Sequence, residues 1–269
     1  MSENPNVHKL LKVEHVVDET PTVRTIIVSD EILYDAQPGQ FCMVWVPGVA
    51  ELPMSIMVIH GKPYAAFTVR KHGSASTALY NIRAGDNIGY RGPYGNSFTI
   101  RKGSLMLVGG GTGLVPLMRL VTRFRSDDEI TVIMGSKTKD EILFERAVKD
   151  LAKSDRCRVV IVTEDGSYGS KGLVTDVVKN EINSKYDAVY TCGPEMMMYN
   201  TIKIAHDAGV FAQASVERVM KCGMGVCGSC CMSDAIVCKD GTIFDAQTLL
   251  SNADFGHTHR DKSGIPVKY

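Results

Sequence analysis

The sequence predicts a fold in three parts: an N-terminal antiparallel β-barrel, a parallel-sheet α/β domain and a small C-terminal module rich in cysteine. Three observations support it. Short strands separated by turn residues fill the first hundred residues, strands alternating with helices follow, and five of the eight cysteines lie between Cys222 and Cys238. A chain of 269 residues can hold two domains and an appendage. We expect the three parts to span residues 1–102, 103–213 and 214–269.

The first part shows short apolar strands at regular spacing with turn residues between them, which is typical of an antiparallel barrel. The expected strands are 9–17, 23–28, 41–47, 54–59, 65–70 and 87–90, with a turn at 37–40 and one short helix over 76–82. Residues 92–96 form a turn that could equally be a simple hairpin.

The second part alternates buried strands with helices, which indicates βαβ units and a parallel sheet. The expected strands are 104–108, 130–134, 158–162 and 188–191, and the expected helices are 114–123, 145–152, 174–180 and 195–208. A glycine-rich loop, 109–113, joins the first strand to the first helix.

The third part carries a candidate cluster site. Cys222, Cys227 and Cys230 have C-x4-C-x2-C spacing, the plant-type spacing for a 2Fe–2S cluster, and thiolates are the soft ligands that such clusters select. The intervening glycines allow the loop to take backbone angles with positive φ, and backbone N–H groups can then point at sulfur. The fourth ligand is Cys238 or Cys231. We favour Cys238, because a residue adjacent to a ligand usually points elsewhere.

Three other interpretations of these cysteines compete. Disulfides need an oxidising compartment, whereas residues 1–6 are polar and give no signal peptide. A structural zinc site usually pairs two C-x2-C knuckles, and only Cys227 and Cys230 form one. A redox-active C-x-x-C pair is expected within a thioredoxin-like βαβ pattern, which is missing around these residues.

Composition excludes some classes of function. Formal net charge is zero and no run of five like charges occurs, so nucleic-acid binding has no electrostatic footprint. The longest apolar stretches are strand-sized, far short of the roughly 20 residues that a membrane span needs. We expect a soluble, cytoplasmic protein.

The loop at 109–113 is a candidate nucleotide site. Glycines at a strand-to-helix junction let a phosphate approach the backbone, and a helix N-terminus offers free N–H groups. The motif departs from G-x-G-x-x-G at Pro116, and residues 134–137 lack the acidic residue that usually follows the second strand. A plain tight turn remains the alternative. Ser136 and Lys137 could tolerate a 2′-phosphate, or Lys137 and Lys139 could be solvated surface charges, so the choice between NADH and NADPH stays open.

Two further stretches are candidate sites. Residues 191–194 end a later strand of the same sheet, where ligands collect, so Cys192 could flank a bound ring or be a buried core cysteine. Residues 70–79 of the barrel place cations and hydroxyls at an expected helix start, which suits a pyrophosphate. The alternative is that Ser76 serves only as an N-cap.

In this order the motifs resemble those of the ferredoxin–NADP reductase superfamily, and most closely the electron-transfer subunits of heteromeric, NAD-dependent dihydroorotate dehydrogenases. The resemblance covers nearly the whole chain. It is carried by Pro53-Met-Ser-Ile, Gly73-Ser-Ala-Ser-Thr, Gly92-Pro-Tyr-Gly, Gly109-Gly-Gly-Thr-Gly, Glu164-Asp-Gly-Ser-Tyr-Gly, Cys192-Gly-Pro, the block 217–230 and the block 237–244.

The resemblance implies an FAD-binding barrel, a nicotinamide-binding α/β domain and a 2Fe–2S domain. The implied FAD contacts are Pro53, Met54, Ser55, Thr68, Val69, Arg70, Gly73, Ser76 and Thr77. The implied NAD contacts are Gly110, Gly111, Thr112, Gly113, Cys192, Gly193 and Pro194. The implied cluster ligands are Cys222, Cys227, Cys230 and Cys238. Leu52 stands where the family usually has an arginine on the flavin phosphates, and Arg70 is the expected substitute.

The implied function is electron transfer in pyrimidine (UMP) biosynthesis. Electrons would pass between an FMN-containing dihydroorotate dehydrogenase catalytic subunit and NAD, in a heterotetramer. NADH gives two electrons as a hydride and the cluster takes one, so a flavin between them is needed. No general acid or base is required, and none is assigned. The alternatives are a reductase subunit of a sulfhydrogenase or of an NADH-dependent ferredoxin:NADP oxidoreductase, and a zinc-bearing nucleotide-binding regulator that is not an enzyme.

Overall fold

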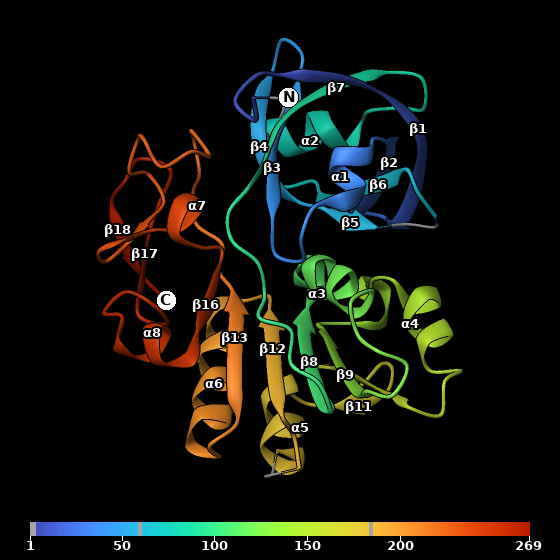
Figure 1. Ribbon diagram of the computed structural model, residues 1–269, viewed down its shortest axis with the longest axis vertical. Helices are drawn as coiled ribbons and strands as arrows, with labels where there is room; N and C mark the ends of the chain where they lie inside the picture. The colour runs from blue at the N-terminus through green and yellow to red at the C-terminus, as the bar shows by residue number, and fades with distance from the viewer. Residues whose placement is uncertain (1–3, 59–60, 183–184) are drawn as a thin grey trace.

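The computed structural model describes residues 4–58, 61–182 and 185–269, and its three parts follow the order of the chain (Figure 1). The barrel lies at the top of the view, the α/β sheet below it, and the C-terminal segment along one side of both. The barrel contains β1 (Lys9–Thr20), β2 (Val23–Ser29), α1 (Glu31–Asp35), β3 (Phe41–Val46), β4 (Ala50–Ser55), β5 (Met57–Val58), β6 (Tyr64–Arg70), α2 (Ser74–Tyr80) and β7 (Asn87–Tyr94).

The barrel strands form one antiparallel sheet in the order β4-β3-β7-β1-β2-β6-β5, which confirms the expected fold of this part. Strand β4, at one edge of the sheet, also contacts β6 near the other edge, which shows that the sheet curls round on itself. The strand expected over 54–59 is wrong as a single element. Its chain changes neighbours at the buried Ile56, so that β4 pairs with β3 whereas β5 pairs with β6. Its last residue, Ile59, lies outside the described residues.

Two other expectations for the barrel need correction. The helix α2 begins at Ser74, with Gly73 as its N-cap, so Ser76 is not the N-cap. Ser76 instead accepts hydrogen bonds at Oγ from the backbone N–H of Gly73 (3.0 Å) and of His72 (3.0 Å). Residues 92–94 continue β7 rather than forming a hairpin, because their neighbours on β3 extend the ladder to Tyr94.

The α/β domain contains the expected alternation of strands and helices. Its elements are β8 (Ser104–Gly110), the 3₁₀ turn Gly111–Gly113, α3 (Leu114–Val121), β9 (Glu129–Ser136), the 3₁₀ turn Lys139–Glu141, α4 (Glu145–Leu151), β10 (Cys157–Thr163), β11 (Ser170–Lys171), α5 (Val174–Glu181), β12 (Ala188–Cys192), α6 (Glu195–Asp207) and β13 (Phe211–Ser215). The strand order β11-β10-β9-β8-β12-β13 is parallel throughout.

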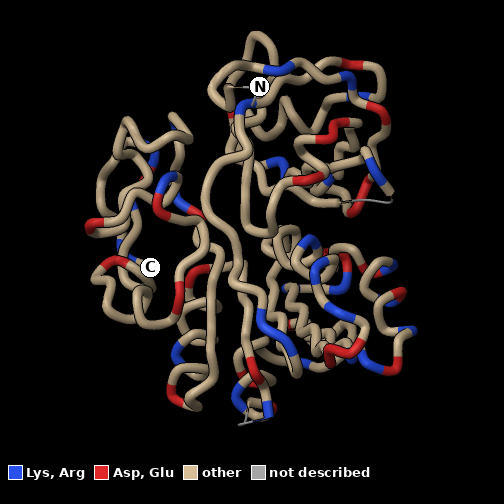
Figure 2. The backbone as a smooth tube through the Cα atoms, in the orientation of Figure 1, with Lys and Arg blue, Asp and Glu red and all other residues tan. Residues whose placement is uncertain are grey.

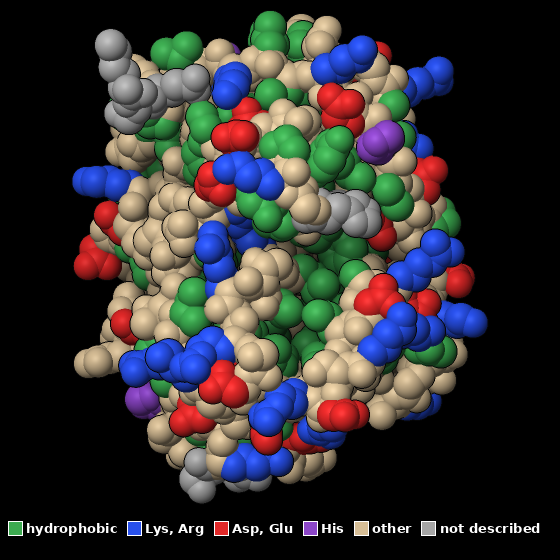
Figure 3. Space-filling view, turned by 45° about the vertical axis from the view of Figure 1, so that its right-hand side comes forward, with side chains coloured by type: hydrophobic (Ala, Val, Ile, Leu, Met, Phe, Trp, Pro, Cys, Tyr) green, Lys and Arg blue, Asp and Glu red, His purple; other side chains and the backbone are tan. Residues whose placement is uncertain are grey.

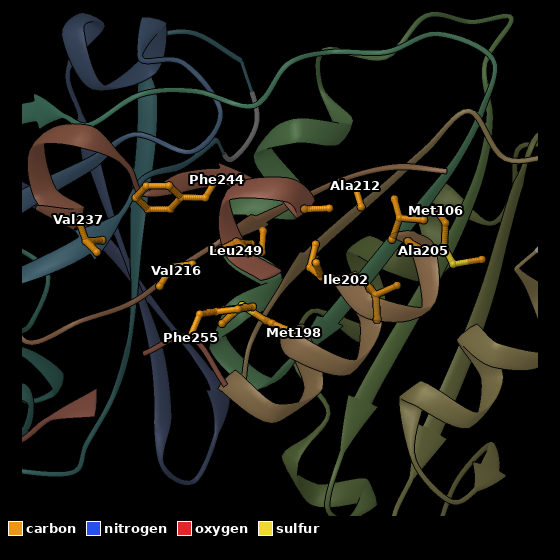
Figure 4. Close-up of a cluster of buried hydrophobic side chains, with 14 of the residues drawn as sticks. Met106, Met198, Ile202, Ala205, Ala212, Val216, Val237, Phe244, Leu249 and Phe255 are labelled. Atoms are coloured by element: carbon orange, nitrogen blue, oxygen red, sulfur yellow. The ribbon is translucent and has the colours of Figure 1, made fainter. Parts of the chain in front are cut away.

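Helices cover both faces of this sheet, which is why β12 is buried throughout and β8 is buried after Ser104. On one face α3 packs against β8 and β12, and α4 packs against β10. On the other face α5, α6 and α8 pack together, and Met198, Ile202 and Leu249 meet in the cluster shown in Figure 4. The sheet is thus fixed from both sides, and its strand ends form a rigid edge.

The C-terminal segment adds β14 (Cys231–Met232), β15 (Ala235–Ile236), α7 (Val237–Asp240), β16 (Ile243–Asp245), α8 (Ala246–Ser251), β17 (Thr258–Arg260) and β18 (Pro266–Lys268). Strand β16 pairs antiparallel with β13 and so joins the edge of the α/β sheet. Strand β13 itself runs past the expected boundary at 213/214, to Ser215. The domain boundaries therefore stay predictions, because the second and third parts share one sheet.

Charged residues are spread along the chain, with basic and acidic positions interspersed (Figure 2). On the face shown in Figure 3, hydrophobic side chains gather in a hollow between the upper and lower halves. No helix in the described part of the chain is long and apolar enough to cross a membrane.

Candidate functional site

Two neighbouring cavities lie where the barrel meets the α/β sheet. The larger, about 560 Å³, opens at the carboxyl ends of the parallel strands and is lined by residues 110–113, 135–137 and 193–194 among others. The smaller, about 310 Å³, lies between β4 and β6 of the barrel and residues 215–220. Arg70, Thr112 and Glu217 line both cavities. Two ligands bound in these cavities would therefore meet beside these three side chains.

The glycine loop is shaped by its contact with the end of β12. A Cβ atom on Gly113 would lie 2.4 Å from the carbonyl oxygen of Cys192, and one on Gly110 would lie 2.8 Å from Cδ of Pro194. Gly111 has φ +55°, a conformation that favours glycine. The structure thus brings together the two nucleotide motifs that the sequence analysis placed at one sheet edge.

Cys192 takes a different position from its neighbours. Gly193 and Pro194 line the larger cavity, whereas the Cys192 side chain is buried in the core and lines neither cavity. Burial raises the pKa of the Cys192 thiol well above its ordinary value. Its contact with a nicotinamide ring stays a prediction, and its surroundings are those of a core cysteine.

Most of the barrel residues assigned to FAD surround the smaller cavity. The cavity is lined by Pro53, Met54, Ser55, Thr68, Val69, Arg70 and Ser76, and also by Leu52. Pro53 and Met54 are presented by β4, which lies opposite Met43 and Cys42 of β3 in the ladder. Gly73 and Thr77 are half-buried and line neither cavity, so their FAD contacts rest on the resemblance alone.

Arg70 is the cation nearest to both ligand spaces. It ends β6, and its Nη1 lies 3.3 Å from Oε2 of Glu141 in the α/β domain, with both side chains 36% exposed. An ion pair this exposed is worth little, so the guanidinium is available for an anionic ligand. Arginine suits this role because its planar fork binds phosphate oxygens in pairs.

We expect Arg70→Ala to lose FAD, because among the described residues the only other cation that lines the smaller cavity is Arg218, whose guanidinium is bound to Glu195. FAD per chain after gel filtration measures this, with Arg70→Lys as the control that keeps the charge. Retention of stoichiometric FAD by the alanine variant would contradict the role.

Glu217 is the functional candidate that the sequence analysis missed. It lies two residues after the end of β13, at the carboxyl edge where ligands collect, and this position in the sequence could have marked it. The side chain is exposed to solvent, yet the protein packed around its carboxyl raises the pKa of that group. No ion pair or side-chain hydrogen bond within the described residues stabilises the ionised Glu217 carboxylate, since the neighbouring Arg218 is bound to Glu195 at 2.7 Å.

We expect Glu217→Gln to stabilise the protein at neutral pH. A carboxyl whose pKa is raised in the fold favours folding below its unfolded pKa, and this contribution is lost as the pH rises through the folded value. The gap in Tm between variant and wild type should therefore be small near about pH 4 and widen towards about pH 8. Thermal denaturation across this range tests it, with the exposed Glu129→Gln as control. A Tm difference between Glu217→Gln and wild type that does not change with pH would contradict a raised pKa for the Glu217 carboxyl.

The cysteine loop wraps its own thiols with backbone N–H groups. Gly225 donates to Sγ of Cys238 at 3.1 Å, Val226 to Sγ of Cys222 at 3.4 Å, and Cys238 to Sγ of Cys230 at 3.3 Å. Gly223, Gly225 and Gly228 have φ of +75°, +80° and +70°, which only glycine adopts at little cost. Such N–H···S contacts stabilise thiolates that carry a metal cluster.

The electrostatics of the loop differ between its thiols. Burial raises the pKa of Cys238 to about 12, and the hydrogen bond that its thiol donates to Cys230 adds to this. Burial also opposes ionisation of Cys222, but backbone N–H groups of Cys227, Met224 and Val226 outweigh it and lower the pKa to about 6. The loop therefore favours the thiolate form of Cys222 over that of Cys238.

Cys231 stands apart from the other thiols of the loop. It lies in β14, paired with Ile236, and no hydrogen bond links its sulfur to Cys222, Cys227, Cys230 or Cys238 within the described residues. Within the same residues, no three His, Cys, Asp or Glu side chains converge on the space of a single metal ion. A mononuclear zinc site would need four such ligands around one ion, whereas a 2Fe–2S cluster divides its ligands between two irons. Four thiols on one loop, three of which accept hydrogen bonds from backbone N–H groups, are a donor set that fits the binuclear cluster.

The chain matches two known domain families. Residues 107–203 match the oxidoreductase NAD-binding domain, and residues 217–250 match the iron–sulfur cluster binding domain of dihydroorotate dehydrogenase B. The second match spans all four expected cluster cysteines and Cys231.

Individual proteins resemble the chain over nearly its whole length. A probable dihydroorotate dehydrogenase B (NAD(+)) electron transfer subunit of Methanocella arvoryzae is 40% identical, over 94% of this chain and 95% of that protein. A protein of the same description from Thermoplasma volcanium is 39% identical, over 96% and 97%. The solved structure of an NADH-dependent reduced ferredoxin-NADP oxidoreductase, described for flavin-based electron bifurcation, superposes with a TM-score of 0.78 at 25% identity, covering 89% of each chain.

Proposed function

Since this chain belongs to the family of dihydroorotate dehydrogenase B electron transfer subunits, we propose that it passes electrons between a dihydroorotate-oxidising catalytic subunit and NAD. The route comprises a 2Fe–2S cluster on the cysteine loop and FAD in the barrel. The observation that carries the proposal is the attachment of a four-thiol loop to a body with two adjoining cavities.

The two cavities divide the work between a nicotinamide and a flavin. FAD, when bound, exchanges a hydride with NAD and single electrons with the cluster. The chain's own residues bind and orient the partners: the glycine loop and Pro194 hold the nicotinamide cofactor, and Pro53 to Ser55 face the flavin. Thr112 and Glu217 lie where the two ligands meet, and filling both cavities excludes water from that junction.

The partner and the setting are further parts of the proposal. We propose an FMN-containing catalytic subunit, in a heterotetramer, that oxidises dihydroorotate during pyrimidine synthesis. We place the complex in the cytoplasm, a reducing compartment that suits a chain whose eight cysteines form no disulfide.

A second candidate function is the reductase subunit of an NADH-dependent ferredoxin:NADP oxidoreductase. It is favoured by the structural likeness with a TM-score of 0.78 over 89% of the chain. The two candidates share flavin, nicotinamide and cluster sites, so the partner protein distinguishes them. Co-purification with a dihydroorotate-oxidising subunit, and NAD reduction by dihydroorotate in that complex, support the first.

Anaerobic purification followed by metal, sulfide and flavin analysis tests the cofactors. We expect one FAD and about two iron and two sulfide per chain. The visible spectrum should be brown-yellow, and single-electron reduction should give the paramagnetic signal of a 2Fe–2S centre. Zinc without flavin would contradict the proposal and support a regulator that is not an enzyme.

A further inference from the structure

Arg91 of the barrel contacts the cysteine loop. It lies in β7, and its side chain is only 8% exposed. Its Nη2 donates to the carbonyl oxygen of Cys222 at 3.2 Å, a contact between residues 131 positions apart. The same guanidinium donates from Nε and Nη2 to Glu51 at 2.8 Å and 2.7 Å, and from Nη1 to Tyr94 at 3.3 Å.

The loop also packs against the barrel at the residue after Cys222. Gly223 is buried with φ +75°, and a Cβ atom there would lie 2.6 Å from Cγ of Met43 and 3.4 Å from Cδ2 of Tyr94. Met43 lies opposite Pro53 in the β3–β4 ladder. The barrel wall that lines the smaller cavity at Pro53 therefore supports the start of the cysteine loop through the neighbouring strand.

The charges around Arg91 are ordered. Its Nη2 bonds to both the Glu51 carboxylate and the Cys222 carbonyl, so the cation lies between the acidic side chain and the loop. Hydrogen bonds from Arg91 lower the pKa of Glu51, which keeps the carboxylate ionised, and His8 binds the same carboxylate at 2.6 Å. Low solvent exposure makes the field of the cation stronger at the loop than on an open surface.

We propose that Arg91 is a positioning residue that docks the Cys222 end of the loop on the barrel and raises the reduction potential of the cluster. The inference rests on the proposed function, since it requires a 2Fe–2S cluster on this loop. A cation beside a ligand residue favours the reduced, more negative cluster. Glu51 opposes this effect from the far side of the guanidinium and holds Arg91 in place.

Redox titration of the purified protein, followed by the paramagnetic signal of the reduced cluster, tests this role in Arg91→Gln, Arg91→Lys and Glu51→Gln. In Arg91→Gln the equilibrium constant for cluster reduction should fall about tenfold, which lowers the reduction potential by about 59 mV for a one-electron couple. Arg91→Lys keeps the charge and should remain nearer to wild type. Glu51→Gln should shift the potential in the positive direction.

The matched control is Arg24→Gln. Arg24 is also paired with a carboxylate, Asp18 at 2.7 Å, but its other contact is the carbonyl of Tyr80, away from the cysteine loop. The Arg24→Gln substitution should leave the reduction potential of the cluster unchanged. Iron, sulfide and FAD per chain are measured first for each variant.

Opposite shifts in Arg91→Gln and Glu51→Gln are the signature of a charge effect, which a purely structural role would not give. Shifts of the same sign in both, or no shift in either, would overturn the proposal. If Arg91→Gln loses its cluster, the Glu51→Gln variant alone tests the proposal. A positive shift of its reduction potential supports the charge effect, and a negative shift or no shift overturns it. A wild-type protein that binds flavin but gives no iron–sulfur signal overturns the proposed function itself and this inference with it.

Discussion

Cys238→Ser is expected to remove the iron–sulfur cluster while leaving flavin and nicotinamide chemistry in place. Cys238 is buried in α7, and its sulfur accepts from the backbone N–H of Gly225 across the loop. A serine hydroxyl is a hard ligand of high pKa, so it replaces a thiolate poorly on iron. Iron and sulfide should fall from about two per chain to near zero. Reduction of a small-molecule acceptor by NADH should persist, because both cavities lie outside the loop.

Cys231→Ser is the matched control for this experiment. Cys231 is adjacent to Cys230 in the sequence but lies in β14, where it pairs with Ile236 of β15. The cluster should therefore form at full stoichiometry in this variant. Loss of the cluster from Cys231→Ser, with retention in Cys238→Ser, would reverse the assignment of the fourth ligand.

Gly113→Ala is expected to abolish nicotinamide binding and to destabilise the α/β domain. The added methyl would lie 2.4 Å from the carbonyl oxygen of Cys192 and 2.5 Å from the backbone nitrogen of Gly193. Both atoms belong to a backbone fixed by β12, which pairs with β8 on one side and β13 on the other. Relief thus requires moving the loop away from the strand end, at about 3 kcal/mol, the upper end of typical overpacking costs.

Binding of NADH, measured by quenching of the flavin fluorescence, and thermal denaturation would record the two effects. Gly61→Ala is the control, since a Cβ atom there meets nothing within 4 Å. Gly113→Ala with wild-type affinity and Tm would mean that the contact between the glycine loop and residues 192–193 is not needed for the site.

Much of the fold could be predicted because its signals are local. The alternation of buried strands and helices from Ser104 to Asp207 follows from runs of apolar residues, and the packing of the sheet on both faces needs no other information. The cysteine spacing and the glycines of the loop are equally local. The alternating strands and helices of the expected fold are confirmed, and the four cluster ligands stay predictions.

What the sequence could not reveal depends on contacts between distant residues. The three-residue strand β16 has no periodicity of its own and exists because β13 offers an open edge. The split at Ile56 reflects a change of neighbouring strand rather than a turn residue. Arg91 and Glu217 have no motif that marks them singly, because their roles come from the loop and the cavities that the fold places beside them.

The pairing of β16 with β13 makes the cysteine segment inseparable from the sheet beside it. A cut at residue 213 or 214 would truncate β13 and remove β16 from its side, leaving the shortened β13 as an exposed sheet edge. Exposed edges of this kind recruit other chains and aggregate. The cysteine segment therefore cannot be excised as an independent domain. It is held at a fixed position relative to the α/β sheet, so the distance between the redox centres is set by the fold rather than by a mobile linker.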